Sequence, residues 1–485
     1  MHSPLSTLKR FFGLNRQSQQ ARARFFRPVI ESMEDRRLMA VLLVDDNFAA
    51  DYPAANRYTT IQAAVNAAAT PTGSNPGDTI IVRPGLYDES VSVAKRVTII
   101  GAGAPSIPFI GTNPNPNDLS LNQQFASIVD PATGAGFTVS ASNVTIQGFT
   151  IANFDDSLDT QGIVVSGGTG NKIFTNVIVD NTIGISLATN TAAGNSGALQ
   201  TTFVTGNTIR NNNTAGAAAG NGIYADAGVR NAIISGNRIH GHENASIIMI
   251  STVAATINSN VQIVGNITGD QVTGEEGTTM IFTNLVDSQV NANIFRNVFT
   301  NAAEGGGSGI FFGGGSTNVQ VIGNNLQDGS YTGINVRYLP GPYAVAVNNS
   351  QLLIQGNIVQ NFGDGGIRLR DGAFNNIVRS NVTQYNGFGS LPADTNDGFG
   401  SGISLEGAIN NLVEYNTSYY NDADGFFADL ASSGNRLNSN GALFNGEHDY
   451  HDDSVGVVAP ALTANTYTNN RGRTQNRTGL IRFFS

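Results

Sequence analysis

The sequence repeats with a period near thirty residues, and this feature constrains the fold more than any local motif. Asparagine ends short apolar segments at Asn207, Asn237, Asn266, Asn297, Asn324, Asn357, Asn381, Asn416 and Asn440. The successive spacings are 30, 29, 31, 27, 33, 24, 35 and 24 residues. A repeat of this kind sets the architecture, because each unit is one small element that only its neighbours can complete.

A second marker recurs between these asparagines, a glycine followed by alternating apolar residues. Examples are GIVV at Gly162, GINV at Gly333 and GFFA at Gly425. Each unit therefore contains two or three strands of about three to five residues, which cannot bury a face unless the units stack. The sequence predicts an all-β fold, a single-stranded right-handed parallel β-helix that forms one domain over residues 41–485. The recurring asparagines are expected to stabilise the turns along the stack, because Asn tolerates left-handed backbone.

The beginning of the β-helix is also marked in the sequence. Residues 60–69 are predicted to form a short amphipathic helix, and DTIIVRPGLY and VTIIGAG the first strands. A capping element is expected because the end of a parallel sheet exposes unpaired backbone. This stretch resembles the opening of extracellular β-helix proteins related to pectate lyases, pectin esterases and uronan epimerases. The resemblance implies a pectin-lyase-type fold.

The charge of the chain is uneven. The net charge is −10, and residues 1–40 hold eight Lys and Arg against three acids, so the remainder carries −15. An acidic body argues against a nucleic-acid partner, which basic side chains would have to bind. The chain has no cysteine, and it has no run of about 18 apolar residues that would predict a membrane span. The sequence does not constrain the oligomeric state.

Residues 1–40 are predicted to be a disordered basic leader. Within them and just beyond, ESMEDRRLMAV resembles a short N-terminal motif of large exported proteins of planctomycete bacteria. The resemblance implies export, to the cell surface or the extracellular space. The alternative is a leader with no sorting role.

Aligning the Gly-Ile repeats predicts which side chains share a face, because strand residues alternate between the two faces of a sheet. Two outward columns follow. The first contains Phe311, Asn335, Arg368, Ser404, Phe427 and His451, and the second contains Gly313, Arg337, Arg370, Glu406, Asp429 and Asp453.

These columns supply the candidate site residues for a linear polysaccharide. The predicted substrate-binding residues are Arg337, Arg368, Arg370, Phe427 and Tyr338, because arginines bind carboxylates and aromatic faces bind sugar rings. The predicted catalytic residues are Glu406, Asp429, His451 and Asp453, which could transfer protons. The alternative is that these charges only stabilise the sheet, with Arg370 and Glu406 as a cross-rung ion pair.

The segment NGEHDYHDDS, residues 445–454, raises the question of a metal site. Asp422, Asp424 and Asp449 are expected in adjacent turns and could form a calcium site, so calcium is the cofactor that the sequence suggests. His448 and His451 could instead bind a transition metal, although residues three apart in a strand tend to point to opposite faces.

The stretch NLVEYNTSYYNDADGFFADL, residues 411–430, resembles the catalytic module of secreted mannuronan C5-epimerases. The resemblance implies proton transfer at C5 of a uronic acid by a His, a Tyr and an Asp. The family's Asp and His positions fall on Ser404 and Glu406 here, so the catalytic motif itself is missing.

The sequence therefore predicts an exported protein that binds an extracellular, acidic polysaccharide. If the protein is an enzyme, it would process that polysaccharide as a lyase, epimerase or glycoside hydrolase. The alternative is a non-catalytic structural or adhesion protein of the cell surface. Loops over one sheet would favour an enzyme, and the candidates are residues 268–279, 338–350 and 387–400.

Overall fold

The computed structural model describes residues 39–71, 76–103, 125–153, 160–187, 200–251, 257–269, 278–296, 307–338, 347–388 and 398–483. The predicted leader, residues 1–40, lies outside the described residues except for Met39 and Ala40. The loop candidates 268–279, 338–350 and 387–400 also lie largely outside them.

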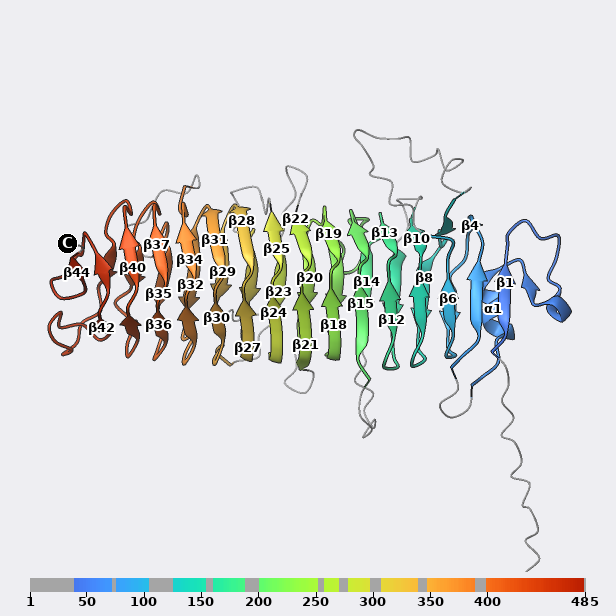
Figure 1. The fold of residues 1–485 in the computed structure, drawn as a ribbon, viewed down its shortest axis with the longest axis horizontal. Coiled ribbons are helices and arrows are strands. Elements are labelled where there is room, and N and C mark those ends of the chain that lie inside the picture. The colour runs from blue at the N-terminus through green and yellow to red at the C-terminus, as the bar shows by residue number, and fades with distance from the viewer. Residues whose placement is uncertain are drawn as a thin grey trace, which may run out of the picture. The chain divides into compact units, whose positions relative to one another are not determined.

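Parallel strands from successive coils form three sheets (Figure 1). Sheet A contains β2 Arg57–Tyr58, β1 Val41–Val44, β3 Thr79–Val82, β6 Thr98–Ile100, β9 Thr145–Gln147, β12 Lys172–Phe174, β15 Thr202–Thr205, β18 Arg230–Ser235, β21 Asn258–Val264, β24 Leu285–Asn291, β27 Thr317–Ile322, β30 Leu353–Gln355, β33 Ile377–Arg379, β36 Leu412–Glu414, β39 Arg436–Asn438 and β42 Thr466–Thr468.

Sheet B contains β4 Gly85–Tyr87, β7 Ser127–Val129, β10 Phe149–Ala152, β13 Val177–Val179, β16 Thr208–Arg210, β19 Arg238–His240, β22 Ile267–Gly269, β25 Ile294–Arg296, β28 Asn325–Gly329, β31 Ile358–Phe362, β34 Val382–Gln384, β37 Thr417–Tyr419, β40 Gly441–Leu443, β43 Arg471–Gly472 and β44 Arg482–Phe483.

Sheet C contains β5 Val91–Val93, β8 Gly134–Val139, β11 Thr160–Val165, β14 Ile183–Leu187, β17 Asn221–Ala225, β20 Ala245–Met249, β23 Met280–Phe282, β26 Ile310–Phe312, β29 Thr332–Val336, β32 Gly365–Arg370, β35 Ile403–Glu406, β38 Phe426–Ala428 and β41 Tyr450–Asp452.

One chain supplies all three sheets in turn. Neighbours in a sheet are three elements apart along most of the chain, as in β30, β33 and β36, so each coil adds one strand to each sheet. The inward side chains form one apolar core, in which Ile163 and Ile185 of adjacent rungs are fully buried. The protein is thus a single-stranded right-handed parallel β-helix of the pectate-lyase-like type, as the sequence predicts.

The N-terminal cap is the predicted helix, α1 Ile61–Ala67. The Thr60 side chain accepts a hydrogen bond from the Ala63 N–H, and the Glu89 carboxylate accepts from the N–H groups of Ile61 and Gln62. These acceptors satisfy N–H groups that a helix start leaves without partners. Strand β1, which precedes the helix and extends sheet A, was not predicted.

The turn between sheets A and B contains a continuous ladder of buried asparagines. Each ladder side chain donates through Nδ2 to the Oδ1 of the next asparagine, at 2.9–3.1 Å, as from Asn266 to Asn293 and from Asn293 to Asn324. The ladder residues are Asn176, Asn207, Asn237, Asn266, Asn293, Asn324, Asn357, Asn381, Asn416, Asn440 and Asn470. Asn297, which the repeat pattern singled out, lies outside the described residues, and Asn293 occupies this ladder position.

Candidate functional site

The strand register places the first predicted column on successive rungs of sheet C. Phe311 pairs with Asn335, Asn335 with Arg368, Arg368 with Ser404, Ser404 with Phe427, and Phe427 with His451. The repeat alignment was therefore correct to the residue. In the second column, the structure pairs Arg370 with Glu406.

Most of the first column is nevertheless buried. A Cβ added at Gly398 would lie 3.0 Å from Phe427 Cδ1 and from Ser404 Cβ, so the chain at Gly398 lies directly on this column. Phe427 is 1% exposed and Arg368 is 0% exposed. Neither side chain reaches solvent, so a sugar could not contact them in this arrangement. Their predicted role in substrate binding stays a prediction.

Arg368 forms a buried ion-pair network. Its Nη2 lies 2.6 Å from Glu406 Oε2, its Nε donates to Glu406 Oε1 at 2.8 Å, and Nη1 is paired with the buried Asp364. The Phe399 ring covers the guanidinium, with its centroid 4.6 Å from Cζ. The two carboxylates within the protein already neutralise this arginine.

The other predicted binding residues are more open. Arg337 Nε donates to Asp371 at 2.9 Å, and both side chains are one third to one half exposed. Arg370 Nε lies 2.9 Å from Glu406 Oε2, while its buried Nη1 has no hydrogen-bond partner among the described residues. Tyr338 is half-buried beside residues 339–346, which the structure does not describe.

Two of the four predicted catalytic residues have carboxylates that already bind other groups of the protein. Glu406 pairs with both Arg368 and Arg370, and Asp429 accepts hydrogen bonds from Gly407 N at 2.9 Å and Ser432 Oγ at 2.7 Å. His451 and Asp453 instead lie together, with the Asp453 side chain 37% exposed. The catalytic role of all four residues stays a prediction.

His451 lies between two carboxylates. Its Nδ1 is 3.1 Å from Asp424 Oδ2, and its Nε2 is 3.0 Å from Asp453 Oδ1. Burial alone would lower the pKa of His451, but Asp424 and Asp453 together raise it to about 9. The imidazole is therefore positively charged at neutral pH in the metal-free protein.

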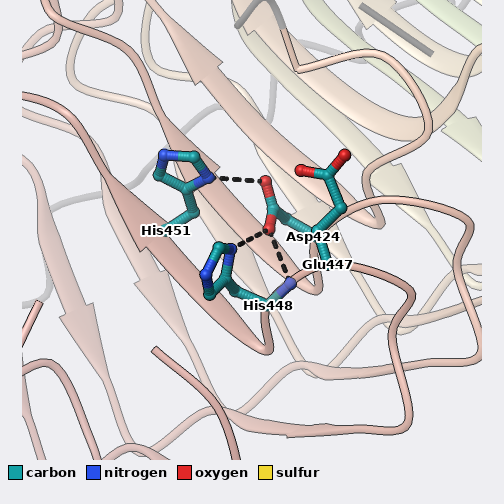
Figure 2. A group of neighbouring side chains, drawn as sticks. All are labelled: Asp424, Glu447, His448 and His451. Atoms are coloured by element: carbon teal, nitrogen blue, oxygen red, sulfur yellow. Dashed lines mark hydrogen bonds and ion pairs between the residues drawn. The ribbon is translucent and has the colours of Figure 1, made fainter. Parts of the chain in front are cut away.

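Four side chains converge at this point and form what we call the histidine–carboxylate cluster: Asp424, Glu447, His448 and His451 (Figure 2). One ligand atom from each lies within 4.8 Å of the others. His448 Nδ1 is 3.4 Å from Asp424 Oδ1, and the two imidazole rings are 5.2 Å apart. Burial and the nearby Asp424 raise the pKa of Glu447.

Two adjacent turns bring the cluster together. Asp424 precedes β38, while Glu447 and His448 precede β41 one coil later. Backbone hydrogen bonds from Gly425 N to His448 O and from Glu447 N to Ala423 O join the turns, both at 2.9 Å. Because His448 lies in the turn and not in the strand, strand alternation does not separate it from His451.

The predicted calcium residues do not converge in the same way. The Asp449 carboxylate accepts from Arg473 N of the last coil at 2.6 Å and from Asn445 Nδ2 of its own turn at 2.9 Å. Asp422 is not a member of the cluster, so only Asp424 of the three belongs to it. The sequence suggested His448 and His451 for a transition metal and Asp424 for calcium, but it did not combine the four cluster members in one metal site. Calcium binding stays a prediction.

No protein-family model matches this sequence, and no curated protein sequence matches it. Solved structures resemble it in fold. A variant of DFA-IIIase from Arthrobacter chlorophenolicus A6 is 14% identical with a TM-score of 0.50, over 81% of this chain and 94% of that one. The mannuronan C-5 epimerase AlgE6 A-module from Azotobacter vinelandii is 13% identical with a TM-score of 0.44, over 88% and 94%. ORF18 of Geobacillus virus E2 is 13% identical with a TM-score of 0.44, over 73% of this chain, which spans 57% of its length.

The likeness to the DFA-IIIase variant supports the fold alone. None of the helical segments in the described ranges has the length and apolar character needed to cross a membrane.

Proposed function

We propose that this protein binds a carbohydrate chain along the outer face of sheet C and acts on it at the last coils. The observation that carries the proposal is the His451–Asp453 pair, an imidazole 3.0 Å from a carboxylate that is 37% exposed. A positioned histidine and carboxylate are the groups that proteins use to transfer protons in reactions of this class. Asp453 is the member of the pair that a substrate can reach.

The column that leads to this pair fits an extended ligand. It begins at Arg370 and continues through Glu406 and Asp429 to Asp453, and at about 4.8 Å per rung it spans about 14 Å. The Arg370 guanidinium, whose side chain is 17% exposed, would bind an anionic group of the ligand. This arginine favours an acidic polysaccharide over a neutral one.

The cellular location in this proposal is extracellular or at the cell surface, and it rests on the leader motif in residues 31–41. The second candidate function is a non-catalytic structural or adhesion protein. The Arg368 network favours it, because Arg368 and Glu406 neutralise each other inside the sheet.

A proton NMR time course on alginate, pectate and a neutral glucan tests the proposal. The full chain is compared with Asp453→Asn and with a control, Asp328→Asn, which alters an acid in sheet B that accepts from Asn361. We expect unsaturated-uronate or inverted C5 signals on an acidic polymer, slowed about 100-fold or more by Asp453→Asn only.

Binding of a polymer without turnover would restrict the function to carbohydrate binding. Neither binding nor turnover on any of the three polymers would favour the structural alternative. Equal loss of activity in both variants would contradict the assignment of the site to Asp453.

A further inference from the structure

We infer that the histidine–carboxylate cluster of Asp424, Glu447, His448 and His451 is a binding site for a divalent transition-metal ion of the Zn²⁺ class. The cluster joins the turn before β38 to the turn before β41 and shares His451 with the proposed carbohydrate site. Metal binding is a separate property, which can be measured without any sugar.

The ligand types decide the class of ion. The cluster offers two imidazole nitrogens and two carboxylate oxygens. Imidazole nitrogen suits Zn²⁺ and its neighbours in the first transition row, whereas Ca²⁺ takes six to eight oxygen ligands. A four-residue set with two histidines is therefore better suited to Zn²⁺ than to the calcium expected from Asp422, Asp424 and Asp449.

The distances fit a small ion. With metal–ligand bonds of about 2.1 Å, the ligand atoms of a tetrahedral site lie about 3.4 Å apart. Asp424 places one carboxylate oxygen beside each imidazole, Oδ1 at 3.4 Å from His448 Nδ1 and Oδ2 at 3.1 Å from His451 Nδ1. One ligand atom from each of the four residues lies within 4.8 Å of the others, so the side chains need to close only slightly around a tetrahedral ion. His448 Nδ1 is buried and, apart from the 3.4 Å ion pair with Asp424 Oδ1, makes no hydrogen bond to any described residue, so a metal ion would supply the bond that this atom lacks.

Asp453 holds His451 in the orientation that a metal ligand requires. Its Oδ1 lies 3.0 Å from His451 Nε2, which keeps a proton on Nε2 and turns Nδ1, the nitrogen that would give up its proton to a metal, toward Asp424. Metal-binding histidines commonly hydrogen-bond through the other ring nitrogen to a carboxylate in this way. Asp453 is thus a positioning residue for the metal site.

The turns that bear the ligands are fixed before any ion binds. His448 N donates to Asp424 Oδ1 at 3.0 Å, and the Gly425–His448 and Glu447–Ala423 backbone bonds join the two turns. Few protein groups therefore have to become ordered when the ion binds, and such preorganisation strengthens the affinity of a site.

The test is a titration of the full chain with Co²⁺, followed by visible absorption, and then displacement by Zn²⁺ in a calorimeter. We expect visible Co²⁺ bands at a stoichiometry of one ion per chain. His448→Ala and Glu447→Gln should each weaken Zn²⁺ binding about 100-fold or more. Asp453→Asn should weaken it about 10- to 100-fold, as loss of a positioning carboxylate does.

Asp422→Asn is the matched control, because it removes a neighbouring acid that is outside the cluster, and its affinity should equal that of the wild type. Since the His448 side chain is 34% exposed, its truncation should leave the fold intact, which circular dichroism verifies. Unchanged Zn²⁺ affinity in both His448→Ala and Glu447→Gln would overturn the inference. Tighter binding of Ca²⁺ than of Zn²⁺ would overturn the class of ion.

Discussion

At the scale of single residues, Arg368 shows how a side chain that points out of the sheet can still be buried. Its strand position points away from the core, but Gly398 and Phe399 cover the column and Asp364 and Glu406 surround the guanidinium. Removing one member of a buried ion-pair network leaves charge without compensation, which is more costly than the network itself is stabilising.

We therefore predict that Arg368→Met destabilises the protein by about 3–5 kcal/mol, because the buried Asp364 would lose its cation and Glu406 would keep only Arg370. Urea unfolding measures this. Adding Asp364→Asn and Glu406→Gln should recover part of the loss. Arg337→Met, which breaks the exposed pair with Asp371, should lose only about 0–1 kcal/mol. Equal losses in the two arginine variants would contradict the prediction.

His242 is a second residue whose environment sets its chemistry. It is fully buried, its Nδ1 accepts from Asn212 N at 3.3 Å, and its Nε2 has no hydrogen-bond partner among the described residues. In the preceding coil Asn212 accepts from Asn181 N in the same way. Burial, with a smaller effect of His240, lowers the pKa of His242 to about 3.

This pKa predicts a loss of stability in acid. The unfolded histidine takes up a proton near pH 6.5 and the folded one only near pH 3, so lowering the pH between these values favours unfolding by about 1.4 kcal/mol per pH unit. His242→Asn should remove this pH dependence of stability, and it places an amide at the position that Asn212 occupies in the preceding coil. The fall in the urea midpoint from pH 7 to pH 4.5 should be larger in the wild type than in the variant. Parallel pH profiles would refute the prediction, and His240→Asn is the control.

At the scale of the structural element, the asparagine ladder joins the coils. Asn293 Nδ2 donates to Ile263 O and to Asn324 Oδ1, and its Oδ1 accepts from Asn266 N, all at 3.0 Å. A ladder amide thus satisfies two backbone groups of the preceding coil and binds the ladder asparagine of the following coil. The side chain is buried, so no solvent can replace it.

We predict that Asn293→Ala destabilises the protein by roughly 2–4 kcal/mol, because Ile263 O and Asn266 N would lose a buried partner. The control is Asn66→Ala on α1, an exposed asparagine in a helix, which should change stability by less than about 0.5 kcal/mol. Urea unfolding of both variants gives the comparison. A small effect of Asn293→Ala would mean that the strands alone fix the turn.

At the scale of the whole molecule, each coil contacts mainly the coils beside it. The strand order advances by one coil at each step from β3 onward, so stability is close to a sum of local contributions. A ligand that joins two turns should therefore stabilise those coils without stabilising distant ones.

Hydrogen exchange with Zn²⁺ tests this consequence. At about 100 times the dissociation constant, the ion should add about 2.7 kcal/mol, which slows exchange of amides near β38 and β41 about 100-fold. Amides of β8 and β11 should not change. His448→Ala should abolish the effect. Uniform protection along the chain would contradict local coupling, and no protection would contradict the metal site.

The sequence by itself determined the β-helix, the helix near residues 60–69 and the two outward columns. It could do so because the coil repeat and strand alternation are regular, so that Phe427 and His451 are adjacent on sheet C wherever the turns lead. The same regularity predicted the Arg370–Glu406 neighbours.

Only the tertiary structure decided which of these side chains are accessible and which turn residues meet. Phe399 covers Arg368 and Gly398 lies on Phe427 and Ser404, although both come from a segment about thirty residues beyond Arg368, and no periodicity predicts where such a segment folds. Asp424 meets His448 and His451 because two turns of adjacent coils follow the same path. Turn conformation depends on contacts distant in sequence, and a strand pattern contains no information about them.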